Sequence, residues 1–183
     1  AMDILLGTAL GVLLLGIEAG IVLGVCCSIV AQLWRGSRPH VAVVGRVPDT
    51  HYFRNTKRHL VEIEPHLLAL RIDENIFFAN TKAVEQAIYQ ALGDYPDTRE
   101  VLLILSAVNH IDSTGLDMLS ELTEGLKERD IGLHLAEGKG PVMDQLQHTD
   151  WIGRQIGQVF PSTDIAFNTL GKVANRAPEH SGE

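Results

Sequence analysis

The chain has 183 residues, enough for one domain of ordinary size and an appendage. Its net charge of −8 is unevenly distributed, since residues 1–34 carry −2, residues 35–58 carry +5 and residues 59–183 carry −11. A basic segment between an apolar run and an acidic body suits a membrane surface and argues against nucleic acid as a partner.

Residues 4–33 form an apolar run that only four polar side chains interrupt. As one helix the run would extend about 45 Å, more than the hydrocarbon core of a bilayer, which is about 30 Å thick. We therefore expect two short membrane segments with a break within residues 16–20, and one strongly tilted helix is the alternative. Arg35 and Arg38 follow directly, a stop-transfer pattern that predicts a cytosolic location for the rest of the chain.

Glu18 is the most informative residue of this run, because a carboxyl group facing lipid is costly. It should therefore face protein, water or an interface. Gly16, Gly20, Gly24 and Ser28 form a stripe of small residues four apart, which lets another helix approach closely. Simple helix flexibility is the alternative explanation of the stripe. Together these features call for neighbouring membrane helices that this sequence does not contain.

Downstream of residue 40, apolar patterns of period two and period 3.6 alternate. The run at residues 101–105 is short and continuously apolar, as in a central strand covered on both faces. The expected strands are residues 41–44, 60–64, 67–72, 101–105 and 131–135, with a short apolar stretch at 76–78. The expected helices are residues 80–92, with Asn80 as cap and Gly93 as stop, 113–129, one starting near Pro141, and 163–175.

This order predicts an α/β domain: a mixed, largely parallel sheet with helices packed on it, and an edge contributed by the first strands. A hydrophobic transmembrane helical segment precedes it. The expected division is membrane segment or segments at 1–36, a basic juxtamembrane linker and first strand at 37–58, the α/β domain at 41–175, and a disordered tail at 176–183.

The strongest local motif is Asp112-Ser113-Thr114-Gly115, at the junction of the central strand with the second helix. Small hydroxyl groups would lie at a helix amino terminus, where free N–H groups and the dipole favour anions. A phosphate on Ser113 would be tolerated there and would change the charge offered to a partner. The alternative is that Asp112 or Ser113 merely caps the helix.

No arrangement of residues predicts catalysis, a cofactor or a metal ion. Ser113 and His110 lack an oriented third group, so the sequence argues against an enzyme. Residues 138–141 lack the spacing of a phosphate-binding loop. The histidines and glutamates between residues 59 and 66 fit the solvated face of a strand better than a metal site.

Several segments resemble the sulfate permease (SulP) transporter family. Residues 37–39, 45–48 and 52–54 look like the linker after that family's last membrane helix, and residues 18–21 with Gly24 and Ser28 look like the helix itself. Segments similar to its STAS domain are Arg71-Ile72-Asp73, Phe77-Phe78-Ala79-Asn80 and Asp112-Ser113-Thr114-Gly115. The similarity covers residues 3–170, and it is carried by the order and spacing of the segments together.

The resemblance implies secondary-active transport of an inorganic anion such as sulfate or bicarbonate, often by a homodimer. This chain would supply the regulatory and assembly domain, while the anion binds elsewhere, on membrane helices absent from this sequence. Those helices and a cytosolic regulatory protein are the expected partners. The expected location is the inner membrane, with the STAS domain in the cytoplasm.

The STAS domain is shared with bacterial anti-sigma-factor antagonists, in which the serine after the aspartate is phosphorylated. That serine corresponds to Ser113. The alternative function is therefore a membrane-anchored partner-switch protein regulated by phosphorylation of Ser113. Glu18 and the glycine stripe distinguish the two, because a simple anchor would not need them. A nucleotide-binding domain is a third hypothesis, which rests only on helix amino termini.

Overall fold

The computed structural model describes residues 2, 5–7, 9, 16–37, 39–47, 53–55, 64–148 and 157–174. The chain divides into two compact units, Ala1–Arg38 and Pro39–Glu183. The predicted strand at 60–64 therefore lies outside the described residues except for its last position, Glu64, which is not in a strand. The predicted tail at 176–183 lies outside them as well.

The first unit contains the helix α2, which spans Ile17–Gly36. It begins directly after Gly16, whose backbone φ of 89° is the left-handed conformation that glycine adopts without a steric cost. The apolar run is therefore interrupted at the first residue of the predicted breaking point. Within the described part of the chain, α2 is the helix whose length and composition suffice to cross a membrane, with a mean hydropathy of 1.8 over Ile17–Trp34. That the run forms two membrane segments stays a prediction.

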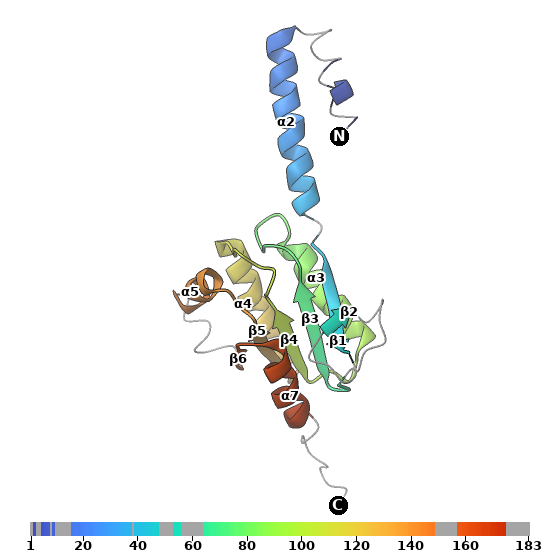
Figure 1. Cartoon of the computed structure of the whole chain (residues 1–183), viewed down its shortest axis with the longest axis vertical. Coiled ribbons are helices and arrows are strands. Elements are labelled where there is room, and N and C mark those ends of the chain that lie inside the picture. Colours follow the sequence, from blue (N-terminus) through green and yellow to red (C-terminus); the bar gives the residue numbers. More distant parts are fainter. Residues whose placement is uncertain are drawn as a thin grey trace, which may run out of the picture. The chain divides into compact units, whose positions relative to one another are not determined.

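The second unit is an α/β domain (Figure 1). In chain order its strands are β1 (Val41–Arg46), β2 (Phe53–Asn55), β3 (Leu67–Ile72), β4 (Glu100–Ile104), β5 (Gly132–Ala136) and β6 (Val159–Phe160). Its helices are α3 (Thr81–Asp94), α4 (Ser113–Lys127), α5 (Gly140–His148) and α7 (Thr163–Ala174).

The described strands form a sheet in the order β2-β1-β3-β4-β5-β6. Strand β1 pairs antiparallel with both β2 and β3, whereas β3, β4, β5 and β6 run parallel to one another. In the parallel part, Leu70 lies opposite Leu103, and Leu103 lies opposite Leu135. This register brings the carboxyl ends of the parallel strands, and the loops that follow them, to one edge of the sheet.

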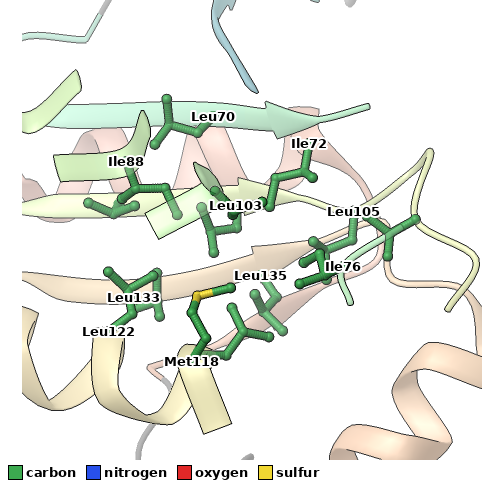
Figure 2. Close-up of a cluster of buried hydrophobic side chains, with 14 of the residues drawn as sticks. Leu70, Ile72, Ile76, Ile88, Leu103, Leu105, Met118, Leu122, Leu133 and Leu135 are labelled. Carbon is green, nitrogen blue, oxygen red and sulfur yellow. The ribbon is translucent and has the colours of Figure 1, made fainter. Parts of the chain in front are cut away.

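Each face of the sheet has its own hydrophobic core. The larger core joins alternate residues of β3, β4 and β5 to α3, α4 and α5, and Figure 2 shows Leu70, Leu103 and Leu135 among its side chains. On the opposite face, the other residues of these strands, such as Leu102, pack against α7 through Phe167. Among the described residues, α3, α4 and α5 thus cover one face of the sheet, and α7 packs on the other.

The predicted fold class is confirmed, and most expected elements are present within two residues of their predicted ends. Two short edge strands, β2 and β6, were not predicted, because two or three residues carry no readable period. The stretch at 76–78 is not a strand, since only Ile76 pairs, in an isolated bridge with Ile111.

For α3 the predicted cap residue is correct in position, but the predicted stop is wrong. Gly93 does not stop the helix, which continues through Asp94. Asn80 occupies the cap position, but its side chain makes no cap hydrogen bond to α3. Its amide oxygen instead accepts the N–H of Phe77 at 2.9 Å, and its amide nitrogen donates to the carbonyl of Asn75 at 2.8 Å. Asn80 therefore folds the preceding loop.

Candidate functional site

The Asp112-Ser113-Thr114-Gly115 motif lies where the chain enters α4, at the carboxyl edge of the parallel sheet. Asp112 has the extended backbone of an N-cap residue, with φ −85° and ψ 177°. Its Oδ1 accepts the N–H of Gly115 at 2.8 Å. Such a bond satisfies one of the free donors of the first helical turn. The capping interpretation is thus correct for Asp112.

Asp112 also joins this motif to the loop after β3. Its second oxygen, Oδ2, accepts the N–H of Phe78 at 2.9 Å, and its own N–H donates to the carbonyl of Ile76 at 3.1 Å. The bridge between Ile76 and Ile111 adds to the same contact. One aspartate therefore fixes two loops that are about 34 residues apart in sequence.

Gly115 occupies a position with no space for a side chain. A Cβ atom there would lie 2.8 Å from Cγ2 of Ile111 and 3.0 Å from Cγ2 of Ile76, both closer than normal carbon contacts. Because both isoleucines are fully buried, neither side chain moves away easily. Because Gly115 has no side chain, the first turn of α4 can pack directly against Ile76 and Ile111.

Ser113 and Thr114 are exposed, in contrast to their neighbours Ile111 and Gly115. Their hydroxyl groups lie in the first turn of α4, where the positive end of the helix dipole favours added negative charge. Phe78, tied to Asp112 through its backbone, is 64% exposed. The motif thus combines a rigid support with hydroxyl groups accessible to a modifying enzyme or a partner.

Asn75 and Lys139 stabilise the loop before the motif. The Oδ1 atom of Asn75 accepts the N–H groups of Asn109 at 2.8 Å and His110 at 3.1 Å. Lys139 donates to Oδ1 of Asn109 at 2.6 Å. No local sequence pattern marks Asn75, because the residues it holds are more than thirty positions away in the sequence.

The histidines and glutamates between residues 59 and 66 do not form a metal site among the residues that the structure describes. In those residues no group of three or more histidine, cysteine or acidic side chains could hold a metal ion. His66 instead bonds through Nδ1 to the carbonyl of Asp97 at 2.9 Å. His59 and Glu62 lie outside the described residues. Glu18 belongs to the other unit, where it is exposed in the first turn of α2.

A second polar cluster, which the sequence did not reveal, lies at the end of β3. Asp73 accepts a hydrogen bond from Nε of Arg71 at 2.6 Å, and its other oxygen lies 2.8 Å from Nδ1 of His40. Partial burial acts to raise the pKa of Asp73, but the bonds from Arg71 and His40 outweigh it, so this pKa lies below its ordinary value. The cluster ties the start of β1 to the end of β3.

Comparison with known proteins gives a consistent result. The STAS domain family matches residues 59–166. High affinity sulfate transporter 2 of Stylosanthes hamata is 29% identical over 178 residues, which cover 91% of this chain and 27% of that protein. The chain thus spans about a quarter of the length of this curated relative.

Solved structures show the same fold at low sequence identity. One match is the murine Solute Carrier 26 family member A9 anion transporter in its inward-facing state. The aligned part covers 93% of this chain and 28% of the transporter chain, with a TM-score of 0.82 and 19% sequence identity. Another match is a Thermotoga maritima protein described as an anti-sigma factor antagonist. The aligned part covers 57% of this chain and 86% of the Thermotoga chain, with a TM-score of 0.50 and 16% sequence identity.

Proposed function

This chain belongs to the STAS domain family, and we propose that it is the cytosolic regulatory and assembly domain of a secondary-active inorganic anion transporter, together with the membrane helix before it. The observation that carries the proposal is the extent of the similarity. The match to a sulfate transporter covers 91% of the chain, well beyond the STAS residues 59–166.

The exposed surface of α2 supports the same function. Its large apolar side chains are mostly exposed, Ile21 by 58%, Ile29 by 55% and Trp34 by 63%. A helix that is apolar all round requires lipid or other helices around it. In a transporter, the remaining membrane helices of the same protein would supply this environment, and Glu18 would face them or water.

In this proposal the anion, sulfate or a bicarbonate-like ion, binds on those other membrane helices, and the STAS domain performs no catalysis. The domain lies in the cytoplasm beneath an inner membrane, and the transporter assembles as a homodimer. Asp112, Ser113, Thr114 and Gly115 form its phosphorylation or partner-binding loop. The exposure of the two hydroxyl groups and the fixed position of Asp112 favour this role.

The first test is the size and activity of the native protein. A tag at the chromosomal carboxyl terminus should report a membrane-bound product several-fold heavier than the 20.0 kDa of this chain. Cells lacking that product should lose uptake of radiolabelled sulfate or bicarbonate. A native product of about 20 kDa with unchanged anion uptake would contradict the proposal and favour the membrane-anchored partner-switch protein.

The second test concerns the loop. In the native transporter, Ser113→Asp and Ser113→Ala should change anion uptake or capture of a cytosolic partner in opposite directions, because only the first adds charge. Thr114→Ala is the matched control, since it removes the neighbouring exposed hydroxyl without touching Ser113. Unchanged uptake and unchanged partner capture in both Ser113 variants would rule out a regulatory role for Ser113.

A further inference from the structure

The face of the sheet that carries α7 contains a cavity of about 210 Å³ at the carboxyl ends of the parallel strands. In parallel α/β sheets this edge is where ligands usually bind. Three apolar residues form one part of the lining and four polar residues the other. The apolar residues are Val44, Phe53 and Ile104, and the polar ones are Arg71, Ser106, Glu137 and Thr163.

Arg71 brings a positive charge to the cavity, and only part of its hydrogen-bonding capacity is used. Its Nε and Nη2 atoms each donate to Asp73, at 2.6 Å and 3.2 Å. A guanidinium group has five N–H donors, so three remain after these two bonds. Among the described residues no other side chain takes them. Arg71 can therefore still bind a carboxylate.

Glu137 is held in an unusual backbone conformation at the end of β5. Its backbone φ of 57° lies in the left-handed region, which residues other than glycine rarely adopt. Its Oε1 accepts both the N–H and the hydroxyl of Thr163, at 3.0 Å and 2.6 Å, at the start of α7. No described residue bonds to its other oxygen, Oε2. The backbone thus places a carboxylate with one free oxygen at the cavity.

These two opposite charges line the same cavity without bonding to each other. No ion pair joins Arg71 to Glu137 among the described residues, although the Glu137 charge is near enough to help raise the pKa of Arg71, after the larger effect of its bond to Asp73. The Ser106 hydroxyl also has no partner in the described part of the chain. The cavity therefore presents a cation, a carboxylate oxygen and a hydroxyl group, each able to bind a ligand.

The balance of charge selects the class of ligand. In the lining the carboxylate of Glu137 opposes the guanidinium of Arg71, which already pairs with Asp73 outside the lining, so an inorganic dianion such as sulfate is disfavoured. A molecule with both an ammonium and a carboxylate group satisfies both sides. We propose that this cavity binds a small zwitterion of the α-amino acid class, with its ammonium group on Glu137, its carboxylate on Arg71 and its side chain against Val44 and Ile104. The lining shares no residue with the Asp112–Gly115 motif, and the inference does not depend on the proposed function.

The test is calorimetric titration of the full 183-residue chain, in detergent micelles, with L-valine and L-serine. We expect binding with a dissociation constant in the millimolar range or tighter. Two analogues of valine each lack one charged group: isobutylamine has no carboxylate and isovalerate has no ammonium. Each should bind at least tenfold more weakly than valine, and sodium sulfate should not compete.

Two variants assign the binding to this cavity. Glu137→Gln keeps an acceptor for Thr163 and so preserves the start of α7, but it removes the charge that binds the ammonium group. Ser106→Ala is a second, milder change, and Lys82→Gln, exposed on α3, is the control. We expect Glu137→Gln to weaken valine binding at least tenfold and Lys82→Gln to leave it unchanged. No binding of either amino acid, or equal binding by the parent chain and both cavity variants, would overturn the proposal.

Discussion

Helix α2 and the α/β domain use the same apolar residue types in opposite ways. In α2, Ile17 is 70% exposed, and Leu33, among the less exposed of its large apolar side chains, is 42% exposed. In the domain, Leu70, Leu103 and Leu122 are completely buried. The domain therefore buries these large apolar side chains in its own core. The apolar side chains of α2 instead require an apolar environment that the described residues do not provide.

This difference in burial indicates which region stabilises the folded chain and which region makes contacts in the membrane. Burial of apolar surface is the main driving force of folding in water, so the folding free energy of this chain should reside in the domain. The apolar side chains of α2 should instead determine insertion in a membrane and contacts with neighbouring helices. Substitutions in the two regions test this separation.

The same truncation in the two regions should have very different effects on folding. Leu103→Ala removes a fully buried side chain from the centre of the larger core and should lower the free energy of unfolding by about 2–5 kcal/mol. Leu33→Ala in α2 is the matched control and should leave the unfolding of the domain unchanged. Urea unfolding of the full chain in detergent, followed by the near-ultraviolet signal of the domain, measures both. Equal losses would show that α2 contributes to the stability of the domain.

Two glycine substitutions separate a packed position from an open one within the domain. Gly115→Ala should destabilise it by about 1–3 kcal/mol, because the new methyl group meets Ile111 and Ile76. Gly93→Ala, in α3 with nothing within 4 Å of the added atom, should stabilise it by about 0.5–1 kcal/mol. Thermal unfolding of the two variants should move in opposite directions. A stable Gly115→Ala variant would mean that the Asp112 loop is looser than the structure shows.

The smallest effect concerns the surface cluster around Asp73. Because the pKa of Asp73 is lowered in the folded protein, its contribution is present above the unfolded value of about 3.9 and is lost as the pH falls through the folded value. Asp73→Asn should therefore cost less than about 1 kcal/mol at pH 7, and the cost should vanish in acid. Urea unfolding between pH 3 and pH 7 measures it. Asp144→Asn, exposed on α5, should follow the parent chain throughout, and a constant cost for Asp73→Asn would disprove the electrostatic origin.

Much of the fold could be predicted because its central elements carry strong periodic signals. The continuous apolar run at 101–105 became β4, and the leucines of the predicted helix at 113–129 lie inward on α4. Elements without such a signal were missed. Strands β2 and β6 are defined by their neighbours in the sheet, and Gly93 does not end α3, which continues through Asp94.

The site shows the same limit. Local sequence located the Asp112 motif and its capping role, because an aspartate followed by small residues at a strand-to-helix junction is a local pattern. It gave no sign that Asp112 also holds Phe78, or that Asn75 supports Asn109 and His110. Those bonds join loops that only the parallel pairing of β3 with β4 brings together.

By itself, then, the sequence determined what depends on neighbours within a few residues. This includes an apolar helix with a basic end, the alternation of strands and helices, and a capped helix start beside exposed hydroxyl groups. The tertiary structure alone decided which distant groups share an edge of the sheet, among them Arg71, Ser106 and Glu137 around one cavity. The physical reason is that strand register fixes such contacts, and register is set by the packing of the whole core.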